Sequence, residues 1–323
     1  MKKRNKRTGP VMLATTVFAL VALSLSAVSE EEPAMAPLQL AAATLEEVEP
    51  RTPISAVPYT IVAPGSYYLT ASLAAANSDG IIISADDVTV DFRGFGLVGV
   101  RPHRGVLLNG ARRNVEIRNG SIRGFGRGIY AQERANDGHR IINMRVVDNE
   151  GAGIYLNGSF HLVKDCTVSG NADSGIFAYT TSIITGNNVY FNAGDGIWTY
   201  LGATVTHNTV NANDGAGIYV SNYCTVRDNT VVTNNLINDP MLGGIRISDD
   251  CFVKNNTVGG NGRAGIFVQR SGNALEENLI TDSPSGVFFN TRGNYYANNR
   301  FSGNGTDLMN TRGNKRGAGN GSF

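Results

Sequence analysis

The sequence predicts an all-β protein, a right-handed parallel β-helix in which about ten coils stack into a three-sheet solenoid. Two observations lead to this prediction. First, a Gly followed by Ile or Val recurs at spacings of 21 to 27 residues, and a period of this length is typical of a solenoid. Second, each repeat holds three short segments of alternating apolar residues, separated by turns rich in Asn, Gly and Asp, as expected for short strands. The recurring glycines are Gly80, Gly105, Gly128, Gly153, Gly175, Gly196, Gly217, Gly244, Gly265 and Gly286.

The coil that starts at Gly217 shows how one repeat is built. Its strands are expected at 218–220, 224–226 and 230–232. Strands this short cannot enclose a core alone, but coils stacked about 4.8 Å apart let each strand pair in parallel with its neighbours. Alternation with period two excludes helical repeats, and a left-handed β-helix would need a strict six-residue period, which is absent. Parallel crossovers are normally right-handed, so we expect a right-handed coil.

The first 28 residues predict export. Five basic residues between Lys2 and Arg7 precede an apolar run from Val11 to Val28, and small residues and three glutamates follow, as in a cleaved signal peptide. The alternative is an uncleaved anchor, because about 18 apolar residues just span a bilayer. Removing residues 1–28 takes the net charge from +1 to −4. We therefore expect a secreted or periplasmic protein that has no membrane contact after cleavage and does not bind nucleic acid.

The remaining chain divides by composition and repeat quality. Residues 29–53, rich in Glu, Ala and Pro, are expected to form a flexible linker. Residues 54–79 are expected to form an N-terminal β cap, because the end of an open strand stack has to be covered. The right-handed parallel β-helix follows over 80–307, and 308–323 are expected to form a degraded last coil and a tail that is disordered from Gly317.

Asparagines recur at one turn of successive coils. Asn tolerates the left-handed backbone conformation that such a turn needs, and stacked amides can hydrogen-bond along the solenoid at about 0.5–1.5 kcal/mol each. We interpret these residues as a structural ladder rather than as catalytic groups. They are Asn187, Asn208, Asn229, Asn256, Asn278 and Asn299.

Three cysteines, Cys166, Cys224 and Cys251, are too few for a disulfide framework. Cys224 and Cys251 fall at equivalent positions of adjacent coils, where Cα atoms about 5 Å apart are within disulfide range. Two free core thiols are the favoured interpretation, because small inward-facing residues occupy this position in other coils as well. No CxxC motif and no His/Cys cluster occurs, so we expect no metal site.

With its GI-x-[VAI] strand, its C-T-V and N-T-V strands and its Asn turn, the region from Gly80 to Asp307 resembles the pectate-lyase-like superfamily. Within it, the chain is most similar to the NosD-type repeat proteins, often described as carbohydrate-binding and sugar-hydrolase modules. The resemblance implies that the Asn ladder lies between the second and third sheets and that the GI-x-[VAI] strand belongs to the first. It also implies a ligand cleft along the outer face of the first sheet, walled by loops of the third turn. The same coils occur in lyases, hydrolases, epimerases and adhesins, so they imply a fold and not an activity.

Alternation along the first-sheet strands predicts a stripe of outward aromatic residues. In Gly153-Ile-Tyr-Leu156, Ile154 and Leu156 face the core, so Tyr155 faces outward. Seven of the nine equivalent positions are aromatic, and Tyr179 and Tyr200 follow two residues after their members of the stripe. The hypotheses are a platform on which sugars stack, rings that stack on one another or lie under the linker, and an interface with a protein partner. The stripe is Leu107, Tyr130, Tyr155, Phe177, Trp198, Tyr219, Arg246, Phe267 and Phe288.

Arg246 is the only charged residue of the stripe, and its rigid fork suits the carboxylate of an acidic sugar. An inserted loop over 234–243 directly precedes its strand and should overhang Tyr219 and Arg246. We therefore take Arg246 and Asp239 of this loop as candidate catalytic residues. The alternative is a salt bridge from Arg246 to Asp239, Asp249 or Asp250. No cofactor is expected; calcium stays an open alternative, but no carboxylate set suited to it is evident on the first sheet.

The leading hypothesis is an exported polysaccharide-binding β-helix, with lyase-type activity on an acidic polysaccharide as its enzymatic version. One alternative is a structural or adhesive module that binds a protein partner. Another, implied by the NosD likeness, is an accessory factor for a periplasmic metalloenzyme, which the scarcity of Cys, Met and His disfavours.

Overall fold

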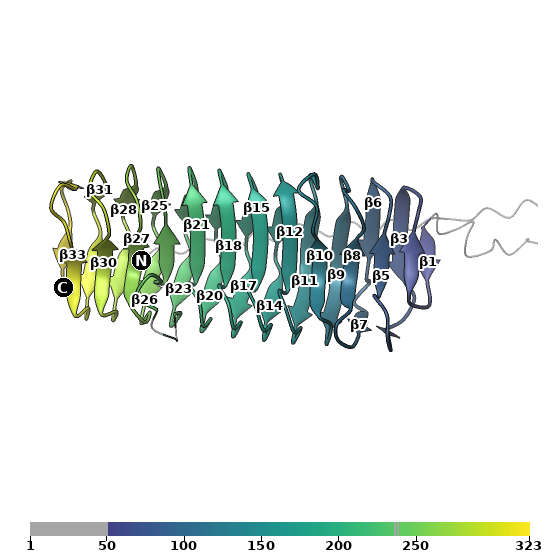
Figure 1. Cartoon of the computed structure of the whole chain (residues 1–323). Coiled ribbons are helices and arrows are strands. Elements are labelled where there is room, and N and C mark those ends of the chain that lie inside the picture. Colours follow the sequence, from purple (N-terminus) through teal and green to yellow (C-terminus); the bar gives the residue numbers. More distant parts are fainter. Residues whose placement is uncertain (1–50, 236, 238) are drawn as a thin grey trace, which may run out of the picture. The chain divides into compact units, whose positions relative to one another are not determined.

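The computed structural model describes residues 51–235, 237 and 239–323, which form a solenoid of short parallel strands stacked coil upon coil (Figure 1). The predicted signal peptide (1–28) and nearly all of the predicted linker (29–53) lie outside the described residues. In the described part, no helix is long and apolar enough to cross a membrane.

The strands form three ladders, as the repeat predicted. The first ladder is β2 (Tyr59–Ile61), β5 (Ile81–Ile83), β8 (Arg104–Leu108), β10 (Arg127–Ala131), β12 (Ile154–Ser159), β15 (Ile176–Thr180), β18 (Ile197–Leu201), β21 (Ile218–Asn222), β24 (Ile245–Ile247), β27 (Ala264–Val268), β30 (Ser285–Phe289) and β33 (Thr306–Met309). The second is β1 (Thr52–Ile54), β3 (Gly65–Leu69), β6 (Val88–Asp91), β13 (Leu162–Lys164), β16 (Ile183–Thr185), β19 (Thr204–Thr206), β22 (Thr225–Arg227), β25 (Phe252–Lys254), β28 (Ala274–Glu276), β31 (Tyr295–Ala297) and β34 (Lys315–Arg316). The third is β4 (Leu73–Ala74), β7 (Gly96–Val98), β14 (Thr167–Ser169), β17 (Asn188–Tyr190), β20 (Thr209–Asn211), β23 (Thr230–Val232), β26 (Thr257–Gly259), β29 (Leu279–Thr281), β32 (Arg300–Ser302) and β35 (Gly321–Ser322).

Two longer strands join the second and third ladders. β9 (Glu116–Arg123) and β11 (Arg140–Val147) run without a break through the turn between these ladders and pair with members of both. The two ladders therefore count as one 23-stranded sheet, beside the separate 12-stranded first sheet.

The described solenoid has twelve coils, because the first sheet has twelve strands, and not the ten marked by the glycine repeat. β2 and β33 add one coil at each end, and neither strand carries the Gly-Ile or Gly-Val signature. In the expected N-terminal cap, β2 pairs in parallel with β5 of the next coil. Thr52 and Pro53, which we expected in the flexible linker, belong to β1, which pairs in parallel with β3. At the other end, β35 pairs with β32, so strand pairing extends past Gly317, where we expected disorder.

The core follows the alternation read from the sequence. Inward residues such as Ile154, Leu156 and Val168 are fully buried along the axis of the solenoid. The Asn ladder lies between the second and third ladders, as expected, with Asn187 placed between β16 and β17. Nδ2 of Asn187 donates to Oδ1 of Asn208 at 2.9 Å, and the contact repeats from coil to coil.

A second Asn ladder, which we did not predict from the sequence, lies in the third turn. This turn leads from the third strand ladder back to the first strand ladder. Nδ2 of Asn192 donates to Oδ1 of Asn213, and Nδ2 of Asn213 to Oδ1 of Asn234, each at 2.9 Å. Both turns that flank the third ladder are therefore tied by internal amides. The members of this second Asn ladder are Asn149, Asn171, Asn192, Asn213, Asn234 and Asn261.

Candidate functional site

The strand register places the predicted stripe in one outward row of the first sheet. Tyr130 pairs with Tyr155, Tyr155 with Phe177, Phe177 with Trp198, and Trp198 with Tyr219. The row continues through Arg246, Phe267 and Phe288. Each coil from β8 to β30 thus contributes one member, and we call this set the outward row.

The rings of the outward row contact one another. Ring centroids lie 4.5 Å apart for Tyr155 and Phe177 and 6.0 Å apart for Trp198 and Tyr219, and the planes of the latter pair are nearly parallel, at 6°. Contacts of this kind favour the self-stacking that the sequence left open, because the ring faces are largely taken by neighbouring rings.

Self-stacking changes which rings can meet a ligand. Phe267 is 1% exposed, Phe177 5% and Tyr130 8%, so these three candidate residues are buried and not solvent-facing. Tyr155, Trp198, Tyr219 and Phe288 are partly exposed. The ring surface that the outward row offers to a ligand is therefore interrupted by its buried members.

Tyr179 and Tyr200 widen the aromatic surface beside Phe177 and Trp198. Their rings are stacked, with centroids 5.0 Å apart and an angle of 9° between the planes. Tyr200 is 43% exposed, the largest exposure among the candidate aromatic residues, and Tyr179 is partly exposed. Together with Trp198, this pair forms the most open aromatic area of the first sheet.

Arg246 lies beside this area and has no carboxylate partner among the described residues. Its Cζ lies 4.4 Å from the centroid of the Tyr219 ring, and its Nη2 donates to Oε1 of Gln269 at 3.1 Å. Its Nε is buried without a hydrogen-bond partner. Asp249, one of the partners considered from the sequence, pairs instead with Arg270 at 3.7 Å.

The structure does not join Asp239 to Arg246. Oδ1 of Asp239 accepts a hydrogen bond from the backbone N–H of Met241 at 2.7 Å, within the inserted loop. Asn235 closes the same loop by bonding the backbone N–H and C=O of Asp239. The carboxylate of Asp239 therefore has a local structural partner, and its catalytic role stays a prediction.

The inserted loop meets the first sheet at its own end. A Cβ added at Gly243 would lie 3.3 Å from Cβ of Phe267, so the loop backbone passes close to the main chain of β27. The ring of Phe267 is stacked on that of Phe288, with centroids 5.4 Å apart. Ile237 and Met241 point away and are exposed.

Asp195 is a residue that sequence reasoning missed. It lies in the third turn, directly before β18, and its Oδ1 accepts a hydrogen bond from the N–H of Ala216 at 2.7 Å. Burial raises the pKa of this carboxyl to about 6, against the lowering effects of the Ala216 hydrogen bond and the nearby charge of Arg246, and Asp173 raises it further. The third-turn position was the available signal, since the resemblance placed the wall of the cleft there.

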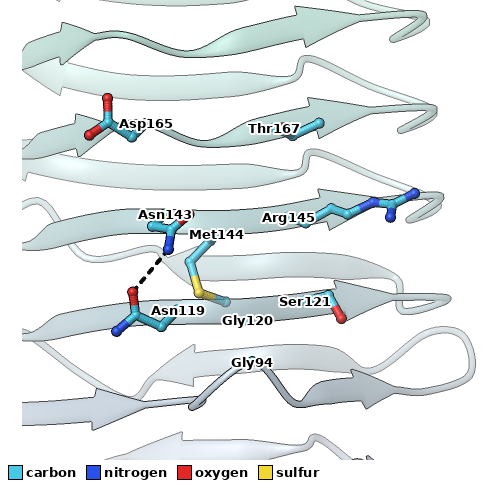
Figure 2. A pocket seen from close by; sticks show the side chains of 9 residues that line it. All are labelled: Gly94, Asn119, Gly120, Ser121, Asn143, Met144, Arg145, Asp165 and Thr167. Carbon is cyan, nitrogen blue, oxygen red and sulfur yellow. Dashed lines mark hydrogen bonds between the residues drawn. The ribbon is translucent and has the colours of Figure 1, made fainter.

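A separate groove of about 470 Å³ lies where the second ladder turns into the third (Figure 2). In it, Nδ2 of Asn143 donates to Oδ1 of Asn119 at 3.1 Å, and the side chain of Arg145 projects beyond them. None of the site residues predicted from the sequence lines it. The groove is lined by Gly94, Asn119, Gly120, Ser121, Asn143, Met144, Arg145, Asp165 and Thr167.

Metal binding has no obvious donor set in the described structure. Over residues 51–235, 237 and 239–323, no three His, Cys, Asp or Glu side chains lie close enough to hold an ion together. The pair His139 and His161 is buried in the first turn, which joins the first ladder to the second.

Coil stacking, ladder register and the Asn ladder define a right-handed parallel β-helix. Comparison with known proteins agrees: residues 104–252 match the family described as "Right handed beta helix region", and residues 200–318 match "Periplasmic copper-binding protein (NosD)". The chain is thus a right-handed parallel β-helix. No curated protein sequence matches it.

Several solved structures share the fold. The A-module of mannuronan C-5 epimerase AlgE6 from Azotobacter vinelandii aligns with a TM-score of 0.65 at 14% identity, over 84% of this chain and 90% of that one. The AlgE4 A-module from the same organism aligns with a TM-score of 0.56 at 15% identity, over 80% and 87%. The Agl-KA catalytic domain aligns with a TM-score of 0.54 at 14% identity, over 84% and 62%. Identities this low establish the fold alone.

Proposed function

We propose that the protein is an exported polysaccharide-binding β-helix that recognises an acidic polysaccharide along its first sheet. The observation that carries the proposal is Arg246, a guanidinium held in the outward row without a carboxylate partner among the described residues. A ligand carboxylate would form the direct ion pair that Arg246 lacks, since Asp195 acts on it only from a longer distance. The likeness to mannuronan C-5 epimerase modules supports a polysaccharide as the ligand class.

The open aromatic area would hold the sugar backbone next to this charge. Tyr179, Trp198 and Tyr200 offer apolar surface within two coils, and Tyr219 leads from Trp198 to Arg246. Coils repeat at about 4.8 Å, close to the rise of one sugar unit in an extended chain. The polysaccharide would therefore lie along the solenoid axis, with an acidic sugar at Arg246.

An enzymatic version of this function needs a proton-transfer group, and we propose Asp195 for that role. With a pKa raised to about 6, its carboxylate is ionised at neutral pH and is a stronger base than an ordinary aspartate. Arg246, whose charge acts on Asp195, would neutralise the sugar carboxylate while a proton is removed. Asp239, whose carboxylate accepts a hydrogen bond from Met241 in the inserted loop, stays a separate catalytic candidate.

Affinity electrophoresis against acidic and neutral polysaccharides tests the binding proposal. Replacing Trp198 by Ala should weaken binding by about tenfold, the effect of losing roughly 1.4 kcal/mol of contact energy. Tyr190→Ala is the matched control, because Tyr190 lies on the third ladder outside the outward row. Equal retention of parent and Trp198→Ala protein on every polysaccharide would end the proposal.

An interaction with a protein is the second candidate, and exposed apolar residues at the first turn favour it. Phe160 is 65% exposed, Tyr223 64% and Ile183 48%. Such residues in one region are typical of an interface. Concentration-dependent assembly that shields Trp198 fluorescence would support this candidate over polysaccharide binding.

A further inference from the structure

Two cysteines occupy equivalent positions in the first turns of two adjacent coils. Cys224 directly precedes β22 and Cys251 directly precedes β25, and N of Phe252 donates to O of Cys224 at 2.8 Å. The two residues are therefore register neighbours in adjacent coils. Their side chains are buried, at 1% and 2% exposed, and both thiols are free in the structure. Sγ of Cys251 donates to O of Ser221 at 3.0 Å, and Sγ of Cys224 donates to O of Asn222 at 3.2 Å, so both sulfurs lie against the end of the strand that carries Tyr219.

In the other two turns, the same two coils are bridged by hydrogen bonds between Asn side chains. Nδ2 of Asn229 donates to Oδ1 of Asn256 at 2.9 Å, and Nδ2 of Asn234 donates to Oδ1 of Asn261 at 3.2 Å. In the first turn, an amide contact begins only one coil later, where N of Cys251 donates to an Asn side chain at 2.9 Å. The two thiols thus occupy the place that an amide bridge takes elsewhere.

We propose that Cys224 and Cys251 are a covalent modification site that forms an inter-coil disulfide when the chain folds in the presence of a disulfide oxidant. Register neighbours of adjacent parallel strands lie about 5 Å apart at Cα, inside the range that a disulfide spans. The bond closes the coil that carries the inserted loop. It ties the strand of Tyr219 to the strand of Arg246, which meet on the first sheet.

Thiol–disulfide exchange accounts for every atom of this step. One cysteine thiolate attacks a sulfur of the oxidant disulfide, which releases one thiolate of the oxidant and leaves a mixed disulfide. The second cysteine thiolate displaces the other half of the oxidant as a thiolate and forms the Cys224–Cys251 bond. The two protons lost by the cysteines pass through solvent to the two released thiolates, so the oxidant disulfide is reduced to two thiols. Because both sulfurs are buried in the fold, exchange takes place before these coils close.

Refolding with oxidised and reduced glutathione, followed by alkylation in denaturant, tests the proposal. Cleavage before aspartate places Cys166, Cys224 and Cys251 on separate peptides, 165–172, 214–227 and 250–281. We expect Cys166 to be alkylated and the other two peptides to be linked until a reductant is added. Three alkylated cysteines, or a link that includes Cys166, would overturn the assignment.

Thermal melting then tests whether the bond holds the two coils together. Reduction should lower the melting temperature of the oxidised parent by several degrees, since the bond constrains the unfolded chain. Cys166→Ser should show the same shift, and Cys224→Ala and Cys251→Ala should show none. A linked parent that melts at the same temperature before and after reduction would refute the tie between the coils.

Discussion

The guanidinium of Arg246 lies over the ring of Tyr219, with Cζ 4.4 Å from the ring centroid. By contrast, the guanidinium of Arg118 is paired with the carboxylates of Asp91 and Glu116 on the second ladder. Arg246 thus keeps a charge that the described fold does not neutralise by an ion pair. A cation held on an aromatic face and next to exposed sheet surface is well placed to meet an anionic ligand.

Replacing Arg246 by Ala should weaken binding of acidic polysaccharides by at least about tenfold, because a charge-assisted contact of roughly 1.5–3 kcal/mol is lost. Arg246→Lys should recover only part of it, since Lys lacks the planar fork. Titration calorimetry at two salt concentrations measures both. Arg270→Ala is the matched control, because Arg270 already pairs with Asp249. A loss of equal size on neutral polysaccharides would contradict recognition of a carboxylate.

Asp195→Asn should abolish any lyase activity while leaving polysaccharide binding in place. In the parent, activity should rise with pH through about 6, because the ionised carboxylate is the base and its pKa is raised to that value. New ultraviolet absorbance from unsaturated product, followed against pH, is the measurement. Asp214→Asn, in the same turn one coil on, serves as the control and should keep the parent profile. Unchanged product formation by Asp195→Asn would exclude Asp195 as the base.

Asp195→Asn should lower lyase activity but raise the stability of the fold. A carboxyl whose pKa rises on folding disfavours the ionised folded state, so the parent loses stability as pH rises from about 4 to about 6. Asp195→Asn should therefore be more stable than the parent at pH 7, by about 1–3 kcal/mol. Urea unfolding at pH 7 and pH 4 should show a difference between the two proteins that shrinks at the lower pH.

Sequence alone was sufficient for ten of the twelve coils, because the information in them is local. Tyr155 between Ile154 and Leu156 fixes which side chain faces out, and the recurring Gly before each first-sheet strand then fixes the register. The second Asn ladder had the same periodic signal, which is visible at Asn192 and Asn213, 21 residues apart. The second Asn ladder could therefore have been predicted from the sequence.

The site could be predicted only in part, because its chemistry depends on contacts between coils. Phe267 is buried although the alternation places it on the outward face, and its ring contacts that of Phe288 in the next coil, with centroids 5.4 Å apart. The raised pKa of Asp195 follows from desolvation of its half-buried carboxyl, which outweighs the lowering effect of the hydrogen bond from Ala216 in the next coil. Neither contact is encoded in the alternation of a single strand.

Acid should destabilise the first turn through His139 and His161. Their rings are stacked with centroids 5.1 Å apart, and Nδ1 of each accepts a backbone N–H of the preceding coil. Burial lowers the pKa of His139 to about 3 and that of His161 to about 4, from 6.5. Since the unfolded rings bind protons first, stability falls as pH drops below 6.5. At pH 5 the loss should reach about 2 kcal/mol per ring.

Urea midpoints between pH 7 and pH 5 measure this effect. His161→Asn should reduce the slope against pH, because an Asn side chain can accept the same backbone N–H, as Asn294 does in this turn. His207→Asn is the control, since His207 is 62% exposed at its side chain and should leave the slope unchanged. An identical slope in all three proteins would remove the buried pair as its cause.

Removing one ladder amide should cost more than its single hydrogen bond is worth. Nδ2 of Asn208 donates to O of Ile184 and to Oδ1 of Asn229, and its Oδ1 accepts from N and Nδ2 of Asn187. In Asn208→Ala these buried partners lose a contact that water cannot replace, so unfolding free energy should fall by about 2–4 kcal/mol. Asn188→Ala, at an exposed position of β17, should change it by less than about 0.5 kcal/mol. Hydrogen exchange should place the loss at the coils on either side of Asn208, because each coil of a solenoid contacts only its neighbours. An equal, global loss in both variants would show that the ladder adds nothing beyond the strands themselves.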